Sequence, residues 1–417
     1  MRIEIPYGGR LIPVEFNAST EVLLPKKVDV KDEKDVLFKA LDQPLGRESF
    51  KVFLEESNHL LVIVNDATRP TPTAKILGFL SPMLQEYSND LGFLVATGSH
   101  RAPTEEELKT IFGETYDVFK EYIHIHDARS RNLVYRGRSS RGTEIYVNPL
   151  VLDYGNIIVI GSVEPHYFAG YTGGRKSFLP GVCGYKTIEM NHSFALEREA
   201  QTFALNGNPV HEDMMEVASR IMEDLNVFSI QTVVTMDGKI YAVTAGDLHS
   251  SFEAAIPYAN EVFSVPLKHK GNIVLSAASP PLDVNLYQSQ KALDNGKLAL
   301  EEDGILILVS KCHGGVGDET FLRLLSQASN PSEVHELIKR GYKLGYHKAA
   351  KIAEVASWAQ LWAVTDLDED VIRKALMKPY KVIQEAVDDA ISIIMERGEE
   401  PYIVILPEGS VTVPRIN

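Results

Sequence analysis

The stretch that decides the fold is Asn156-Ile-Ile-Val-Ile160, together with the segment His166-Tyr-Phe-Ala-Gly-Tyr-Thr-Gly-Gly-Arg-Lys-Ser-Phe-Leu-Pro-Gly181 that follows it. A short apolar run predicts a buried strand, so the second segment is expected in a loop at the strand's carboxyl end. Open α/β sheets bind their ligands at this edge. Glycines let backbone approach a ligand closely, while imidazole and amine groups supply bases, nucleophiles and metal ligands. The segment therefore predicts an active site.

Two further apolar runs have the same form. Residues 60–64 precede a polar segment rich in turn residues, and residues 91–96 precede another, residues 97–103. A helix is expected to begin after Thr104, which can cap it and is followed by three glutamates. Three apolar strands that each end in a polar loop are typical of a parallel sheet.

The pattern begins again after Asn272, where residues 273–277 and 304–310 are predicted as new buried strands. We therefore expect an α/β protein with two domains of mostly parallel sheets flanked by helices, and an active site in the interdomain cleft. Residues 1–269 are predicted to form an N-terminal α/β catalytic domain that carries the histidine and lysine motifs. Residues 270–417 are predicted to form a C-terminal α/β domain that closes the substrate site.

The composition excludes several classes of protein. A formal net charge of −15 argues against a general nucleic-acid or anionic-membrane surface, so no nucleic-acid or membrane partner is expected. The two cysteines, Cys183 and Cys312, supply neither a disulfide framework nor a thiolate metal cage. Neither a signal peptide nor an apolar run long enough to cross a bilayer is visible in the sequence. These features predict a cytoplasmic protein whose positive charges act locally on a small anion.

The segment from Gly170 to Ser177 invites comparison with a phosphate-binding P-loop. Such a loop needs Gly-x-x-x-x-Gly-Lys-Ser/Thr, but Arg175 stands where the second glycine is required. An ATP-hydrolysing function is therefore disfavoured, although a glycine-rich anion site is compatible with the sequence. No Gly-x-Gly-x-x-Gly follows a predicted strand, which argues against an ordinary dinucleotide-binding fold.

Each histidine also has an ordinary explanation. His100, His166 and His192, taken singly, are best explained as loop histidines bonded to backbone, but together with Lys176 at one sheet edge they favour a functional site. The pair His124 and His126 is predicted to face solvent. His313, beside two glycines, receives no role. Residues 287, 288 and 291 have helical spacing after Pro280-Pro281, which by itself indicates a solvated helix start.

Five motifs resemble the signature elements of the lactate racemase family, the nickel-dependent 2-hydroxyacid racemases and epimerases. The motifs are Asp66-Ala-Thr-Arg-Pro70, Thr97-Gly-Ser-His-Arg101, His166 to Lys176, Asn191-His192 and Tyr287-Gln-Ser-Gln-Lys291. They occur in the family's order along roughly the first 290 residues. The agreement of five separate motifs makes the resemblance specific.

The resemblance implies a cofactor and its ligands. Lys176 resembles the lysine that covalently holds a nickel pincer nucleotide, the nickel-bound pyridinium-3,5-bisthiocarboxylic acid mononucleotide. His192 resembles the protein ligand of the nickel, in a planar four-coordinate set that suits Ni(II). The segment Asp66, Ala67, Thr68 and Arg69 resembles the one that contacts the cofactor. Other proteins are expected to make and insert this cofactor.

The resemblance also implies catalytic and substrate-binding residues. His100 and His166 resemble the paired acid/base residues, and Arg69 can in addition hold a carboxylate. Tyr287, Gln288 and Lys291 resemble substrate-binding positions. The implied activity is inversion of the C2 centre of a 2-hydroxy acid, with lactate as the leading candidate. The reaction is expected to move a hydride to and from the cofactor, coupled to proton transfer, through a 2-keto acid intermediate.

Three alternatives remain open from the residues alone. The first is a racemase of the same family that acts on a different 2-hydroxy acid. The second is a zinc-dependent hydrolase that uses His100, His166 and His192 as ligands. The third is a non-catalytic anion-binding protein whose glycine loop and arginines bind a phosphate or a sugar acid.

Overall fold

The structure is a computed structural model that describes residues 1–87 and 90–416. The chain divides into two compact units: unit 1 comprises Met1–Lys26 and Phe263–Asn417, and unit 2 comprises Lys27–Val262. This division differs from the predicted one mainly at the start of the chain. The first 26 residues belong to unit 1, because β3 (Ser19–Val22) pairs in parallel with β19 (Tyr402–Leu406). A pairing between segments so far apart in sequence leaves no local signal.

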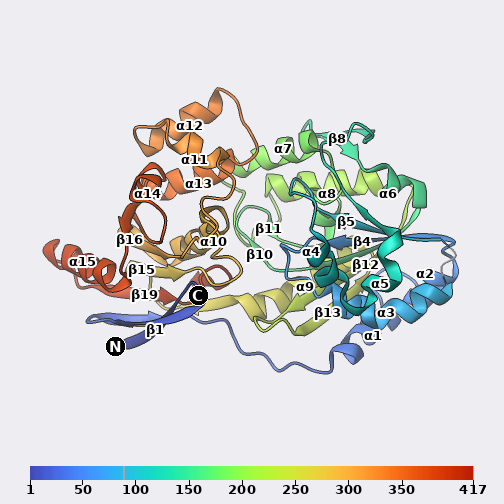
Figure 1. Ribbon diagram of the computed structural model, residues 1–417, viewed down its shortest axis with the longest axis horizontal. Helices are drawn as coiled ribbons and strands as arrows, with labels where there is room; N and C mark the ends of the chain where they lie inside the picture. Colours follow the sequence, from blue (N-terminus) through green and yellow to red (C-terminus); the bar gives the residue numbers. More distant parts are fainter. Residues whose placement is uncertain (88–89, 417) are drawn as a thin grey trace. The chain divides into compact units, whose positions relative to one another are not determined.

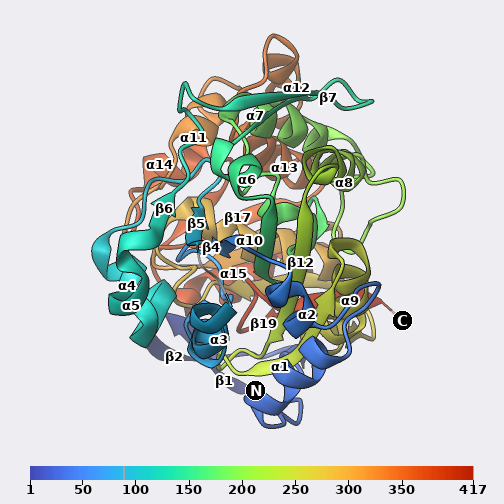
Figure 2. The same ribbon diagram turned by 90° about the vertical axis from the view of Figure 1, so that its right-hand side faces the viewer.

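Unit 2 is built on a six-stranded sheet with the order β13-β12-β9-β4-β5-β6 (Figures 1 and 2). Only β13 is antiparallel to its neighbour. The predicted strands 60–64, 91–96 and 156–160 lie in β4, β5 and β9, so the parallel sheet is confirmed. The strands are β4 (His59–Asn65), β5 (Asp90–Ala96), β6 (Ile123–Ile125), β9 (Asn156–Ser162), β12 (Asn226–Val234) and β13 (Ile240–Gly246). Two hairpins accompany them, β7 (Val134–Arg138) with β8 (Glu144–Val147), and β10 (Pro165–His166) with β11 (Gly170–Tyr171).

One face of this sheet forms the apolar core of unit 2 with α1 to α4, through residues such as Leu37, Phe53, Leu80 and Phe112. The predicted helix start is confirmed, because the Thr104 side chain accepts a hydrogen bond from the backbone of Glu107 in a capping box of α4. The helices of unit 2 are α1 (Glu33–Asp42), α2 (Phe50–Glu55), α3 (Thr73–Tyr87), α4 (Glu105–Phe112), α5 (Tyr116–Phe119), α6 (Pro149–Tyr154), α7 (Tyr185–Ser193), α8 (Pro209–Met222) and α9 (Leu248–Phe263).

Unit 1 has its own six-stranded parallel sheet, with the order β18-β17-β16-β15-β19-β3. The predicted strands 273–277 and 304–310 correspond to β15 and β16. Figure 1 shows the hairpin of β1 and β2 beside β19 and α15, although these segments lie at opposite ends of the chain. The remaining strands are β1 (Arg2–Tyr7), β2 (Arg10–Glu15), β14 (Ser264–Leu267), β15 (Gly271–Ala277), β16 (Leu300–Val309), β17 (Gln360–Val364), β18 (Lys378–Tyr380) and β20 (Val413–Ile416).

Two apolar clusters cover the two faces of the unit 1 sheet. On one face, Val274, Leu306 and Leu361 pack against α10, α11, α12 and α13. On the other face, Leu275 and Ile307 pack against α15 and the β1–β2 hairpin. The helices of unit 1 are α10 (Leu286–Gly296), α11 (Thr320–Leu325), α12 (Pro331–Lys339), α13 (Tyr346–Ala356), α14 (Glu369–Lys374) and α15 (Ile383–Glu396). In the part of the chain that the structure describes, no helix is both long and apolar enough to cross a membrane.

Candidate active site

The carboxyl ends of β4, β5 and β9 meet at one edge of the unit 2 sheet. Asn65 is aligned with Ala96 across β4 and β5, so the segments that begin at Asp66 and Thr97 leave the sheet side by side. The hydroxyl of Thr71 links the first of these segments to the end of β9, because it accepts a hydrogen bond from Asn65 Nδ2 (2.6 Å) and lies 2.9 Å from Ser162 Oγ. The sheet register thus brings three predicted motif segments together.

Asp66 orients the imidazole of His100. The carboxylate is 7% exposed, and its Oδ2 lies 2.7 Å from Nδ1 of His100. Burial raises the pKa of Asp66, but the hydrogen bonds from His100 and Thr68 and the charges of His100 and Arg69 outweigh it and lower the pKa overall. An ionised carboxylate can only accept, so Nδ1 of His100 carries a hydrogen, and in the neutral form of the ring Nε2 has the lone pair. This arrangement allows the neutral form of His100 to accept a proton at Nε2.

His166 has the complementary arrangement. Its Nδ1 accepts a hydrogen bond from the backbone N–H of Ala169 (3.3 Å), so the neutral ring carries its hydrogen on Nε2. The ring is stacked on Tyr167, with centroids 4.9 Å apart. At Nε2, therefore, His100 offers a lone pair and the neutral form of His166 offers a hydrogen.

Arg175 supports the loop that carries His166 and Lys176. Its side chain is fully buried, and its guanidinium donates to the carbonyls of Ala169 (2.7 Å), Gly173 (3.2 Å) and Thr172 (3.3 Å). Arg175 also lies 4.4 Å from the centre of the Phe252 ring. The residue that breaks the P-loop pattern is therefore an internal support of the loop, since these three hydrogen bonds all go to carbonyls of that loop.

Phe168 is the common neighbour of the remaining motif residues. Its buried ring lies 4.5 Å from the ring of His166 and 5.2 Å from the ring of His192, centroid to centroid. The ammonium of Lys176, a side chain only 9% exposed, lies 5.6 Å from the same ring. Two of the predicted histidines and the predicted lysine thus surround one aromatic side chain.

His192 lies at the end of α7 in an environment that keeps its ring neutral. Loss of solvation is the main cause that lowers the pKa of His192 to about 3, and the positive charges of Lys176 and Arg69, with a smaller effect from His100, act in the same direction. Lys176, Arg69 and His100 therefore act electrostatically on His192. A neutral imidazole is the form that binds a metal.

A buried network holds the turn of α7 that carries His192. The carboxylate of Asp213 (α8, 1% exposed) accepts hydrogen bonds from Ser139 Oγ (2.5 Å), Thr143 Oγ1 (2.9 Å) and Asn191 Nδ2 (2.9 Å). The two hydroxyls flank the turn of the β7–β8 hairpin, so Asp213 joins that hairpin, α8 and α7. Three neutral donors satisfy a buried carboxylate that would otherwise be costly.

The prediction that His124 and His126 both face solvent is wrong for His126. β6 ends at Ile125, and the His126 side chain beyond it is only 3% exposed. Its Nε2 donates to the carbonyl of Cys183 (2.9 Å), and its Nδ1 accepts from Asn148 Nδ2 (3.1 Å). The carbonyl of His126 also accepts from Thr97 Oγ1 (2.8 Å). His126 therefore ties the segment that carries His100 to the one that follows Lys176.

The predicted substrate-binding residues lie on α10 of unit 1. Tyr287, Gln288 and Lys291 are half-buried and share one stripe of a helix whose other residues are buried. The helix begins at Asn285, whose side chain accepts from the backbone N–H of Gln288. The structure thus groups the predicted site residues in two places: those from Asp66 to His192 in unit 2, and those on α10 in unit 1.

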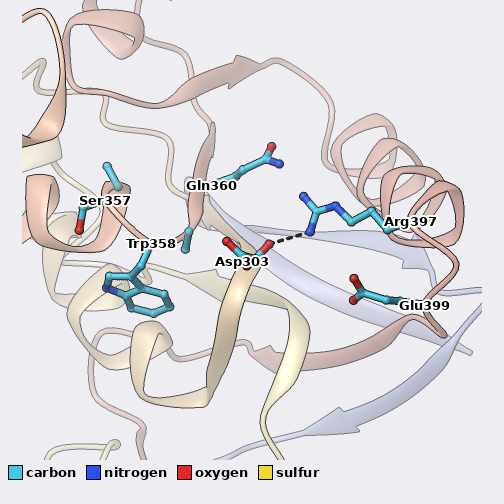
Figure 3. Close-up of a pocket in the computed structure, with 8 residues that line it drawn as sticks. Asp303, Ser357, Trp358, Gln360, Arg397 and Glu399 are labelled. Carbon is cyan, nitrogen blue, oxygen red and sulfur yellow. Dashed lines mark hydrogen bonds between the residues drawn. The ribbon is translucent and has the colours of Figure 1, made fainter.

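A cavity of about 470 Å³ in unit 1 is not part of either group (Figure 3). It lies where β17 begins at Gln360, next to Trp358 and Arg397, and Arg397 donates to the carbonyl of Asp303 (2.7 Å). In α/β sheets, ligands bind at the carboxyl ends of the strands, whereas this cavity lies at an amino end. We assign it no function.

Two residues of the site were not predicted from the sequence. Phe168 could not be predicted because the sequence around an aromatic residue in a glycine-rich loop is the same whether the ring contacts site residues or only packs in the core. Asp213 could not be predicted because its partners come from two other segments of the chain, the β7–β8 hairpin and α7. Among the described residues, no group of three histidine, cysteine, aspartate or glutamate side chains is arranged to hold a metal by itself. The zinc alternative therefore has no support in the geometry.

Comparisons with known proteins agree with the motifs. A family model described as the lactate racemase N-terminal domain matches residues 7–203, and one described as the lactate racemase C-terminal domain matches residues 267–413. The chain is 29% identical to the lactate racemase of Thermoanaerobacterium thermosaccharolyticum over 428 residues, with 99% of each protein covered. It is also 29% identical to the lactate racemase of Lactiplantibacillus plantarum over 424 residues, with 98% of each covered.

Solved structures extend the similarity to the fold. The structure of the lactate racemase apoprotein from Thermoanaerobacterium thermosaccharolyticum is similar to this chain with a TM-score of 0.89 at 28% identity, over 100% of both chains. A Thermotoga maritima protein is similar with a TM-score of 0.72 at 16% identity, over 92% of this chain and 98% of that one, which shows the fold alone. Motifs, both domain matches and full-length relatives converge, and the chain is a member of the lactate racemase family, an isomerase.

Proposed function

We propose that the protein inverts the C2 centre of a 2-hydroxy acid, with lactate as the leading candidate. The main support is the grouping in unit 2 of His166, His192 and Lys176 around Phe168, close to the Asp66–His100 pair. An identity of 29% to the two named lactate racemases supports the reaction class more strongly than it supports lactate itself. A different 2-hydroxy acid is therefore the main alternative substrate.

The chemistry explains why the family needs more than side chains. The C2 hydrogen of a 2-hydroxy acid is scarcely acidic, and an imidazole with an ordinary pKa of about 6.5 is far too weak a base to remove it. Moving that hydrogen as hydride avoids a carbanion but requires an electrophile that side chains lack. When bound, the nickel pincer cofactor that the family generally uses supplies this electrophile.

The residues in unit 2 fit that cofactor. Lys176 supplies a primary amine for covalent attachment, and His192 supplies one neutral imidazole for the nickel. A single protein ligand suffices for a metal that brings its own donors, which agrees with the absence of a three-residue ligand group among the described residues. Asp66, Ala67, Thr68 and Arg69 form the turn beside His100 and are proposed to contact the cofactor.

The two remaining histidines supply the proton transfers. We assign removal of the hydroxyl proton from one enantiomer to Nε2 of His100, whose lone pair is set by the bond from Nδ1 to Asp66. His166 is assigned the same task for the other enantiomer, from the opposite side; for this its Nε2 must carry the lone pair and its Nδ1 the hydrogen, so the contact with the N–H of Ala169 opens. In each inversion one histidine takes the hydroxyl proton, and the other, which already holds a proton on Nε2, gives it to the oxygen of the planar 2-keto acid as that acid is reduced on its side.

The carboxylate of the substrate must stay anchored while C2 becomes planar. Arg69 offers a bidentate fork in unit 2, and Lys291 offers a point charge in unit 1. Tyr287 and Gln288 share the helix face of Lys291 and are proposed to bind the same substrate.

The experiment that tests the function is a substrate screen. The protein is loaded with the cofactor by its biosynthesis proteins and incubated with chiral 2-hydroxy acids, and loss of optical activity is followed. We expect at least one acid to racemise or epimerise, and lactate to be among them. If no 2-hydroxy acid loses optical activity although mass spectrometry shows loaded protein, the proposed function is refuted.

A further inference from the structure

The first turn of α10 is held by a glycine-containing loop, residues 312–317. The backbone N–H groups of Leu286 and Tyr287 donate to the carbonyls of Gly315 (3.2 Å) and Val316 (3.0 Å). A Cβ at Gly317, where φ is +84°, would lie 2.8 Å from the Asn285 side chain and 3.0 Å from Cβ of Tyr287. This close approach explains why residue 317 is a glycine. The loop therefore supports the helix that carries Tyr287, Gln288 and Lys291.

Lys348 of α13 supports the same turn from a different element. Its side chain is only 4% exposed, and its Nζ donates to the carbonyl of Tyr287 at 2.8 Å. The same ammonium lies 4.1 Å from the centre of the Tyr287 ring. A second hydrogen bond joins α10 to α13, because Gln290 Nε2 donates to the carbonyl of Lys348 (3.0 Å). One lysine thus contacts both the backbone and the ring of Tyr287.

To make this contact, the ammonium of Lys348 loses its hydration, a free-energy cost that an apolar side chain in the same place would not have. Burial lowers the pKa of Lys348 to about 7; the carboxylates of Asp294 and Asp318 oppose that shift, and the charge of Lys291 adds to it. A leucine or methionine would fill the space without desolvating an ammonium. Lys291 is the charged side chain on the half-buried stripe of α10, and it lies one turn from Tyr287.

We propose that Lys348 is a positioning residue that sets Tyr287, and through the first turn of α10 also Lys291, in place to bind the substrate. The inference rests on the proposed function, because it assigns Lys348 to the substrate side of that reaction. Lys348 acts through α10 and does not itself contact the reacting atoms. Binding of the substrate carboxylate in the ground state and in the transition state should depend on it equally, so its loss should raise KM and leave kcat nearly unchanged.

The matched control is Lys351 on the same helix. It lies three residues further along α13, is 8% exposed, and pairs with Glu354 at 3.3 Å. Replacing either lysine with methionine removes one buried ammonium from α13. Only the change at Lys348 removes the contacts with Tyr287.

The test compares Lys348→Met, Lys348→Arg and Lys351→Met in cofactor-loaded protein. We expect Lys348→Met to raise KM for the 2-hydroxy acid about tenfold for both enantiomers, with kcat within about twofold of the unchanged protein. Lys348→Arg keeps a cation and a donor and should recover most of the loss. Lys351→Met should leave KM unchanged. Hydrogen exchange of unloaded protein should show faster exchange of residues 286–291 in Lys348→Met than in Lys351→Met.

The outcomes separate the two proposals. If the loaded, unchanged protein racemises no 2-hydroxy acid, the proposed function is refuted, and the role of Lys348 falls with it. If that protein is active but Lys348→Met has the KM of Lys351→Met, or loses kcat at constant KM, only the role of Lys348 is refuted. If Lys348→Met does not fold, Lys348→Gln takes its place, because glutamine keeps a donor for the Tyr287 carbonyl. We expect Lys348→Gln to fold and to raise KM by a smaller factor. An unchanged KM in that variant would overturn the inference.

Discussion

Replacing Asp66 with asparagine should slow the proton transfer assigned to His100 while leaving the fold intact. The asparagine keeps the size of the side chain but removes the charge that His100 Nδ1 contacts at 2.7 Å. Its amide can also present an N–H to the ring and so favour the wrong tautomer. The mechanism therefore predicts a weaker and less well oriented base.

The size of this effect follows from the geometry. A hydrogen bond to a charged group contributes about 1.5–3 kcal/mol, and each 1.4 kcal/mol changes a rate roughly tenfold. Asp66 is 7% exposed, but the His100 side chain is 40% exposed, so solvent screens part of the interaction. We therefore use the lower part of the range and expect a loss of about 10- to 30-fold.

Steady-state rates of racemisation cannot distinguish the two histidines, so the assay needs a half-reaction. The equilibrium constant between enantiomers is one, so kcat/KM must be equal in both directions for every variant. The asymmetry is visible only in a half-reaction. Loaded protein is mixed with one enantiomer at a time, quenched with acid within a single turnover, and the 2-keto acid is measured. Asp66→Asn should slow its formation from one enantiomer far more than from the other, and His166→Ala should show the opposite preference.

Two controls accompany the measurement. Because Asp66 is also proposed to contact the cofactor, intact mass is used to normalise each rate to the loaded fraction. Asp237→Asn removes an exposed carboxylate that pairs with Lys239, and it should leave both half-reactions unchanged. Equal slowing from both enantiomers in Asp66→Asn, or no slowing at all, would refute the assignment of His100 and Asp66 as a pair.

Three further predictions concern cofactor attachment and stability. Lys176→Ala should abolish the covalent adduct in intact-mass spectra. The control Lys186→Ala, which removes an exposed lysine paired with Glu144, should retain the adduct. An adduct in Lys176→Ala would contradict the attachment site. His211 is buried, and its pKa is lowered to about 3, chiefly by burial and also by the charge of Arg175. The folded protein therefore favours the neutral ring, so the contribution of His211 to stability is present above pH 6.5 and is lost as the pH falls toward 3. From pH 7.5 to 5 this one group should cost about 2 kcal/mol, and urea melts of His211→Gln should show a weaker pH dependence by about that amount. Asp213→Ala leaves three buried donors without their acceptor and should lower the free energy of unfolding by about 3 kcal/mol in urea melts, while the exposed change Asp224→Ala should cost less than about 1 kcal/mol.

Local signals in the sequence determined most of the secondary structure and the identity of the motif residues. The apolar runs that became β4, β5, β9, β15 and β16 are recognisable because a buried parallel strand needs a continuous apolar stretch. The start of α4 is recognisable because Thr104 and Glu107 satisfy backbone donors within a few residues of each other. The candidate site residues could be predicted because their types and order resemble those of a family, and such a comparison needs no coordinates.

Only the tertiary structure decided which partners those side chains have. It paired Asp66 with His100, buried His126 against Cys183, placed Phe168 between His166 and His192, and joined residues 1–26 to the last strands of the chain. It also showed that Arg175 supports its own loop and that Lys348 contacts Tyr287. Burial, charge and hydrogen bonding act through space between segments tens to hundreds of residues apart, and a single sequence contains no periodicity that records such contacts.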